Sequence, residues 1–200
     1  MNLSTLAASL HPKHWKNLAR LYRNHRWEAD DAGDILIGHA RLSGMYETNA
    51  PDGLGWVATK NLLTTEGINH LLSVGIAGGV QVGTWYIAPF SGNISVADTL
   101  TAATFASSAT ELTTQYSESS RVAFQESVPA SKSTNNTSNP SVFTTASDNV
   151  NIWGIGLLSI STKGSTSGTL LSVAKYSTVR NLPVTGDQIS VKYTLTLANG

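Results

Sequence analysis

The sequence contains no cysteine and few charged side chains. Without cysteine the chain can form neither a disulfide nor a thiolate metal site. Only 13% of its 200 residues are charged, which is about half the usual share. The thirteen basic residues balance the thirteen acidic ones, so the formal net charge is zero. Such a chain has no overall attraction for nucleic acid, and we expect no nucleic-acid partner.

Long apolar runs are also missing. None approaches the roughly 18 residues that a membrane-spanning helix needs, and we expect no membrane partner. The first residues, MNLSTLAASLHPKHW, have no basic stretch before their short apolar run, and we expect no signal peptide. Serine and threonine make up roughly a quarter of the chain. Their hydroxyl side chains suit the solvent-facing side of a β-sheet.

Residues 1–34 are predicted to form an N-terminal arm, because basic charge is concentrated at their start. Pro12 suits the first turn of a helix over residues 11–26. At about 100° per residue this helix would have one apolar face and one basic face. The apolar face would carry Trp15, Leu18 and Tyr22, and the basic face Lys13, Lys16, Arg20 and Arg23.

Two interpretations of this arm remain open. The arm can dock its apolar face on a partner and its basic face on an acidic surface. Alternatively, it is an ordinary amphipathic helix that packs on its own domain. A helix lying on a membrane surface is a third interpretation, which we do not favour. On the first interpretation, the apolar and basic side chains of the arm are candidate interface residues.

Residues 35–200 are predicted to form a mainly β domain, because short apolar segments alternate with turn residues. The clearest strand covers residues 189–197, where apolar and polar side chains alternate. Residues 150–161 are apolar on both faces, which indicates a central strand or an interface strand. The remaining strand segments are 34–42, 80–90 stopped by Pro89 and the following SGN, 110–116, 121–128, 141–145 and 168–177.

The number and spacing of these segments favour an antiparallel β-sandwich or jelly roll. The segment ASKSTNNTSNPS, residues 130–141, is almost entirely small and polar. It cannot bury enough apolar surface to offset its ordering entropy, so we expect a long exposed loop there, mobile unless a partner holds it. Long helices that alternate with strands are absent from the pattern, which argues against a doubly wound fold.

One short helix is predicted after residues 56–63. Thr64 or Thr65 can cap its N-terminus by accepting a backbone hydrogen bond. Glu66 falls in the first turn, where the helix dipole favours an acidic side chain. The pattern predicts that the helix buries one apolar stripe, formed by Ile68, Leu71 and Leu72.

The segment HLLSVGIAGG, residues 70–79, resembles a phosphate-binding loop only in its glycine content. Such loops precede a helix, because the anion sits at the helix N-terminus. Here the glycines follow the helix, at the negative end of its dipole. We therefore expect a structural corner, in which Gly75 is a left-handed C-cap and Gly78–Gly79 form a turn.

No pattern of catalytic or metal-binding residues stands out. The five histidines are scattered, and no serine lies in a nucleophile-elbow motif. Glu111, Glu118 and Glu126 are the candidates for a pair of glycosidase carboxylates, but we favour a solvated edge for them. We therefore expect no enzymatic activity, no metal, no cofactor and no small-molecule substrate.

Three aromatic side chains of the domain are further interface candidates. Trp85 and Tyr86 are adjacent on a predicted strand, so they point to opposite faces. Trp153 lies on the strand that is apolar on both faces. Exposed aromatic residues are enriched at protein interfaces. The alternative is that both faces are covered within the domain, by the short helix or the arm.

Three sequence blocks together resemble the small structural proteins encoded among the virion genes of tailed bacteriophages. These blocks are NLLTTEGINHLLSVGIAGGVQVGTWYIAPFSGN (61–93), WGIGLLSISTKGSTSGTLLSVAKYS (153–177) and GDQISVKYTLTLANG (186–200). The likeness lies in the residue pattern of these blocks and in their order, over about the last two thirds of the chain. It includes no catalytic signature.

The resemblance implies a non-enzymatic virion component, made in the cytoplasm of a bacterial host. It points to a capsid decoration or cement protein that binds and stabilises major capsid protein subunits. Self-association would be symmetric, as a dimer or trimer. The alternative with the same fold class is a tail component, a head–tail connector component or a receptor-binding module.

Overall fold

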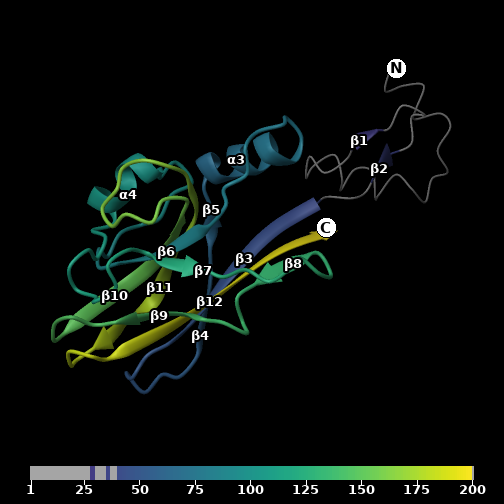
Figure 1. Cartoon of the computed structure of the whole chain (residues 1–200). Coiled ribbons are helices and arrows are strands. Elements are labelled where there is room, and N and C mark those ends of the chain that lie inside the picture. The colour runs from purple at the N-terminus through teal and green to yellow at the C-terminus, as the bar shows by residue number, and fades with distance from the viewer. Residues whose placement is uncertain (1–27, 30–34, 37–39, 200) are drawn as a thin grey trace. The chain divides into compact units, whose positions relative to one another are not determined.

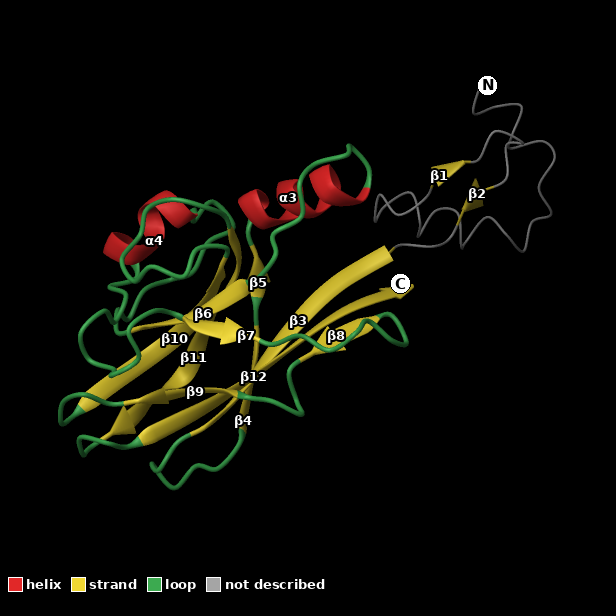
Figure 2. Cartoon of the chain, in the orientation of Figure 1, coloured by secondary structure: helices red, strands yellow, loops and turns green. Residues whose placement is uncertain are grey.

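Two antiparallel β-sheets that pack face to face form the body of the protein (Figures 1 and 2). The computed structural model describes residues 28–29, 35–36 and 40–199. Residues 42–197 make one compact unit, and the described residues 28–29, 35–36, 40–41 and 198–199 belong to a second unit. In that second unit β1 (Glu28–Ala29) pairs antiparallel with β2 (Ile35–Leu36).

The first sheet has five strands in the order β5-β11-β10-β6-β7, and the second has the order β4-β3-β12-β8, with β9 also paired to β12. The strands of the first sheet are β5 (Leu62–Leu63), β6 (Trp85–Phe90), β7 (Val122–Phe124), β10 (Val150–Leu158) and β11 (Leu170–Leu182). Those of the second are β3 (Ala40–Asn49), β4 (Val57–Lys60), β8 (Ser133–Asn135), β9 (Ser141–Thr144) and β12 (Gln188–Asn199).

The predicted mainly β fold with antiparallel sheets is confirmed, and the arrangement is that of a β-sandwich. Strand β12 follows its predicted alternation, because Ile189, Val191 and Tyr193 are buried and the residues between them are half-buried. The core between the sheets combines these side chains with those of the first sheet, including Ile87, Ile155, Leu157 and Leu171.

Strand β10 is the central strand of the first sheet, as its two apolar faces predicted. Ile155 and Leu157 face the core between the sheets, whereas Leu158 faces a second core on the outer side. That second core is covered by helix α4 (Ala102–Ser108) and the chain before it. Phe105 of α4 packs over Gly156, where an added Cβ would lie 2.6 Å from the Phe105 ring.

The prediction of one short helix is wrong, because the described residues contain two. Helix α3 (Thr65–Gly75) was expected, and Thr64 caps it by accepting a hydrogen bond from the Gly67 amide at 3.0 Å. Helix α4 was not expected, since its seven residues, AATFASS, show no helical apolar period beyond Ala102 and Phe105. Figure 2 shows both helices on the side of the first sheet.

The predicted buried stripe of α3 is also wrong. Ile68 and Leu72 are exposed, and only Leu71 of the three packs against the core between the sheets. The residue that α3 buries is Gly67, which lies against the backbone of Leu171. The helix therefore approaches β11 through a glycine and leaves much of its apolar side chain surface uncovered.

The corner after α3 differs from the prediction in one residue. The left-handed backbone is at Gly78, with a φ of 71°, and not at Gly75. The Gly79 amide donates to the Ser73 carbonyl at 2.8 Å, which folds the chain back along the helix end. The strand that follows begins at Trp85 rather than at residue 80.

Strand β6 ends at Phe90, directly before SGN, as predicted, and Pro89 lies inside it. Pro89 pairs with Ile155 of β10, and its carbonyl on the other side accepts from the Leu112 amide at 3.0 Å. Strand β7 pairs only with Trp85, Tyr86 and Ile87, so it ends before Pro89. The missing proline N–H therefore removes no ladder hydrogen bond.

Two further segments depart from the predictions. Residues 110–116 form no strand, and Glu111 and Tyr116 make only isolated bridges. Residues 130–141 are not simply an exposed loop, because β8 pairs with β12 there. Asn136 is buried beside it: its side-chain oxygen accepts from the Tyr193 amide at 2.7 Å, and its side-chain nitrogen donates to the Val191 carbonyl at 3.2 Å.

Candidate interaction surfaces

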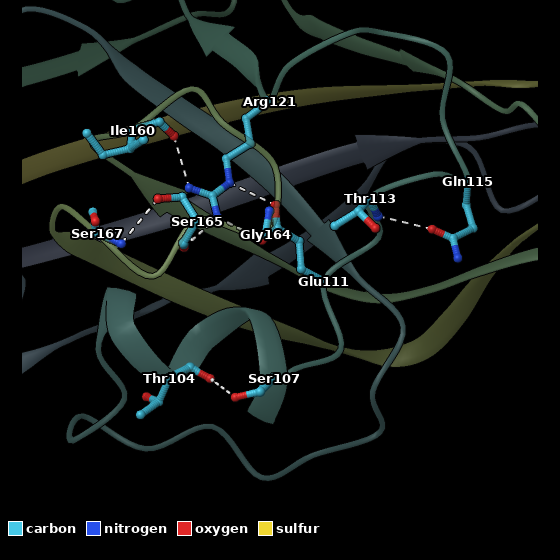
Figure 3. A network of polar contacts seen from close by, with 10 residues as sticks. All are labelled: Thr104, Ser107, Glu111, Thr113, Gln115, Arg121, Ile160, Gly164, Ser165 and Ser167. Carbon is cyan, nitrogen blue, oxygen red and sulfur yellow. Dashed lines mark hydrogen bonds and ion pairs between the residues drawn. The ribbon is translucent and has the colours of Figure 1, made fainter.

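A buried ion pair lies within the segment between α4 and β7 (Figure 3). The Arg121 guanidinium donates to both carboxylate oxygens of Glu111, at 2.8 and 2.7 Å, and neither side chain is exposed. Arg121 also donates to the carbonyls of Ile160 and Ser165, and Glu111 accepts from the Gly164 amide. These contacts fasten the 159–168 loop to the segment that precedes β7.

The neighbouring Tyr116 and Lys163 extend this network. The Lys163 ammonium lies 3.5 Å from the centre of the Tyr116 ring and donates to the Tyr116 carbonyl at 2.9 Å. Partial burial lowers the pKa of Lys163, and burial raises that of the Tyr116 hydroxyl. The Arg121, Glu111 and Lys163 side chains bond to each other and to backbone, whereas the buried Tyr116 hydroxyl has no hydrogen-bond partner among the described residues. We interpret the network as structural.

This finding corrects one of the sequence-based expectations for the glutamates. Glu111 is buried and paired, so it does not lie on a solvated edge. Glu118 is half-buried and accepts from the Thr144 amide at 3.1 and 3.2 Å, which binds the chain before β7 to β9. Glu126 is exposed, as expected.

A second buried ion pair holds the turn between β3 and β4. The Arg180 guanidinium of β11 pairs with the Asp52 carboxylate, one of its contacts being 2.9 Å long. The same guanidinium donates to the Thr48 carbonyl at 2.9 Å and the Gly55 carbonyl at 3.1 Å. Arg180 is completely buried, so one side chain clamps the turn at its start, middle and end.

This clamped turn presents apolar side chains to solvent. Leu54 is 51% exposed and Trp56 is 44% exposed. The Lys192 ammonium of β12 lies 3.8 Å from the centre of the Trp56 ring, which is cation–π distance. We call Leu54, Trp56 and Lys192 the turn surface. Its exposed tryptophan is one of the residue types that anchor protein interfaces.

The second exposed apolar surface lies on α3. Ile68, Leu72 and Ile76 are 42, 53 and 84% exposed, and they recur every four residues. We call these three residues the α3 stripe. Val80, after the turn that ends the helix, is 89% exposed. A helix whose outer face carries several exposed aliphatic residues in one row is typical of a contact surface.

The charged side chain of α3 points into the domain. One oxygen of Glu66 accepts from the Ala102 amide at 2.9 Å and from the Leu170 amide at 2.7 Å. Glu66 thereby joins three elements: α3, the N-terminus of α4 and the start of β11. The Ala102 amide is one of the groups that a helix N-terminus leaves without an internal partner.

The aromatic candidates of the domain are largely used in its own packing. Trp85 packs against the core between the sheets and contacts His70 of α3 edge-to-face, with ring centres 5.4 Å apart. Trp153 packs against the second core, with the Lys175 ammonium 5.6 Å from its ring centre. Tyr86 is half-buried. The structure does not bring these three together into one surface.

The arm candidates lie outside the described residues: Trp15, Leu18, Tyr22, Lys13, Lys16, Arg20 and Arg23. The sequence pattern did not predict the exposure of Leu54, Trp56 and the α3 stripe. Trp56 follows the turn sequence NAPDGLG, and an aromatic residue next to a dense turn is a signal that could have identified it.

Among the described residues, no group of three or more histidine or acidic side chains is placed to hold a metal ion. No described helix is both long enough and apolar enough to cross a membrane. Comparison of the chain with protein-family models, curated proteins and solved structures found no match.

Proposed function

We propose that the chain is a non-enzymatic structural protein of a tailed bacteriophage virion, most simply a capsid decoration or cement protein. Its partners are major capsid protein subunits and further copies of itself. The resemblance of residues 61–93, 153–177 and 186–200 to phage virion proteins supports the virion assignment. The contacts of the turn surface support the binding role.

The observation that carries the binding role is the clamp on the turn between β3 and β4. Arg180 is fully buried and makes contacts with Asp52, Thr48 and Gly55. Removing a guanidinium from water is costly, and the hydrogen bonds and the ion pair offset that cost. The result is a turn held in one conformation while Leu54 and Trp56 face solvent.

A rigid turn with exposed apolar side chains favours protein binding over other roles. The partner need not order the turn when it binds, so less binding energy is lost as conformational entropy. Lys192 gives the turn surface a positive charge beside its aromatic ring, which can select a partner of complementary charge. We assign this surface to the capsid protein.

The direct test is co-sedimentation with purified capsids that lack this protein. Wild-type protein should sediment with the capsids. Trp56→Ala should bind at least about 30-fold more weakly, because a central aromatic anchor contributes about 2 kcal/mol or more. Val128→Ala is the matched control, since Val128 is also exposed but lies far from Trp56 in sequence. Wild-type protein that stays in the supernatant would contradict the proposal.

Copy number separates decoration from the tail or connector alternative. A decoration protein covers the capsid lattice, so its amount in purified virions should be similar to that of the major capsid protein. A tail or connector component should be present in far fewer copies. Quantitative gel analysis or mass spectrometry of virions measures this ratio. A small copy number would favour the alternative.

A further inference from the structure

Helix α3 has apolar side chains on two faces, and the domain covers one of them. The inner face carries Gly67, against Leu171, and Leu71, which packs on the core between the sheets. The outer face carries the α3 stripe, whose three side chains fall within about 80° of one another at 100° per residue. Within the part of the chain that the structure describes, this stripe is left exposed to solvent.

The chain segment that carries the stripe has almost no charge. Residues 61–97 contain one charged side chain, Glu66, and its carboxylate is bonded to the amides of Ala102 and Leu170. In a contact between identical surfaces a charge near the two-fold axis meets its own copy, and like charges repel. A neutral stripe avoids this cost. The turn surface differs, because it includes the Lys192 ammonium.

We propose that α3 pairs with α3 of a second copy of this chain across a two-fold axis, through the α3 stripe. Such a contact is isologous, so Ile68 of one copy packs against Ile76 of the other and Leu72 lies near the axis. The four-residue spacing forms the ridge that packs into the groove of a facing helix in the commonest class of helix contact. Glycines 75 and 78 beside it have open space at their Cβ positions, so no side chain blocks the approach.

The inference rests on the self-association in the proposed function and narrows it to a dimer. It does not depend on where in the virion the protein lies. Two helices of three turns make a small contact beside the roughly 800 Å² that each partner buries in a standard complex. We therefore expect a dimer that dissociates on dilution, and that forms readily where copies are concentrated side by side.

Light scattering on the full-length chain, over concentrations up to about 1 mM, tests the pairing. Wild-type protein should approach dimer mass as its concentration rises. Leu72→Asp should raise the dissociation constant at least about tenfold, because two desolvated carboxylates would face each other near the axis. Val184→Asp is the matched control, an exposed valine in the turn before β12, and should leave the association unchanged.

The absence of cysteine permits a second, geometric test. Leu72→Cys introduces the one thiol of the chain, and the two copies should form a disulfide under mild oxidation if their Cα atoms lie within about 7 Å. Ser107→Cys, on the exposed side of α4, is the control and should cross-link far more slowly at the same concentration. Cross-linking remains informative even if another part of the chain also associates.

Several outcomes would overturn the pairing: wild-type protein that is monomeric at about 1 mM, a trimer, an association unchanged in Leu72→Asp, or equal cross-linking of the two cysteine variants. If the wild type is monomeric and Leu72→Asp no longer binds capsids, then capsid protein, and not a second copy, covers the stripe. The proposed function is tested by a different measurement, the co-sedimentation of the wild type and of Trp56→Ala with capsids, so its failure can be distinguished from failure of the pairing.

Discussion

Gly67 of α3 packs so closely on Leu171 of β11 that an added Cβ would lie 2.7 Å from the Leu171 Cα atom. This contact is backbone against backbone, so no flexible side chain can move aside. It sets the distance between α3 and the first sheet. It also explains why the helix buries a glycine where an amphipathic pattern would place a large apolar side chain.

The first prediction concerns this contact. Gly67→Ala should lower the free energy of unfolding by about 1–3 kcal/mol, because the added methyl group forces α3 away from β11. Gly75→Ala is the matched control in the same helix, with open space around its Cβ position. That variant should be stabilised by about 0.5–1 kcal/mol, since alanine loses less backbone entropy than glycine. Denaturant unfolding measures both, and equal effects would contradict the close contact.

The second prediction concerns the clamp on the turn between β3 and β4. Arg180→Met should cost about 3–5 kcal/mol of unfolding free energy, because it leaves the nearly buried Asp52 carboxylate without its partner. Lys192→Met is the control, since it removes a half-buried cation over Trp56 and should cost about 1 kcal/mol or less. Thermal or urea unfolding distinguishes the two. A loss below about 1 kcal/mol in Arg180→Met would show that the clamp does not hold the turn.

The third prediction concerns the Glu111–Arg121 pair. Glu111→Gln keeps the shape of the side chain but leaves the Arg121 guanidinium as an unbalanced buried charge, and should cost about 3–5 kcal/mol. The exposed Glu126→Gln should change stability by no more than about 0.5 kcal/mol. Hydrogen exchange at Gly164 adds a local measurement, because its amide donates to Glu111. Unchanged exchange there would argue against a fastened loop.

The fourth prediction is a loss of stability in alkali. Burial raises the pKa of the Tyr46, Tyr116 and Tyr176 hydroxyls above the ordinary value, and raises that of Tyr193 to about 12. Above about pH 10 these groups ionise in the unfolded chain before they do so in the folded one. The unfolded state then binds fewer protons, so stability is complete below pH 10 and falls as the pH rises.

Each such tyrosine should remove up to about 1.4 kcal/mol per pH unit above its unfolded-state pKa. Urea unfolding between pH 8 and about pH 11 measures the slope. Ultraviolet titration should show the four buried phenols ionising together with unfolding. Ionisation of all four in a protein that remains folded would contradict their burial.

Some elements could be predicted from the sequence because one force dominates them. Strand β12 has a single wet face, so the alternation from Ile189 to Tyr193 reports burial directly. Strand β10 is covered on both sides, and its continuous apolar run indicates burial of both faces. The Thr64 cap was also predictable, because it depends on residues three apart in the chain.

Other elements depend on partners that a local pattern does not include. The apolar residues of α3 were identified, but the period cannot tell which of two apolar faces the domain covers. Strand β8 is polar, and Asn136 holds it through bonds to β12 made across a long sequence separation. The Arg180–Asp52 pair joins residues 128 apart, so no motif signals it. The rigid conformation of the turn surface depends on that pair and could not be predicted for the same reason.

The position of β12 has a consequence for how the protein folds. This last described strand lies inside the second sheet, bonded to β3, to β8 and to β9. Asn61 and Tyr193, which hydrogen-bond beside β3, are 132 residues apart. A nascent chain on the ribosome therefore cannot close the second sheet until β12 has emerged, and until then β3 and β4 offer an unpaired edge. Such long-range closure slows folding and prolongs the exposure of that edge to neighbouring chains, so chaperone demand during synthesis should fall mainly on this sheet.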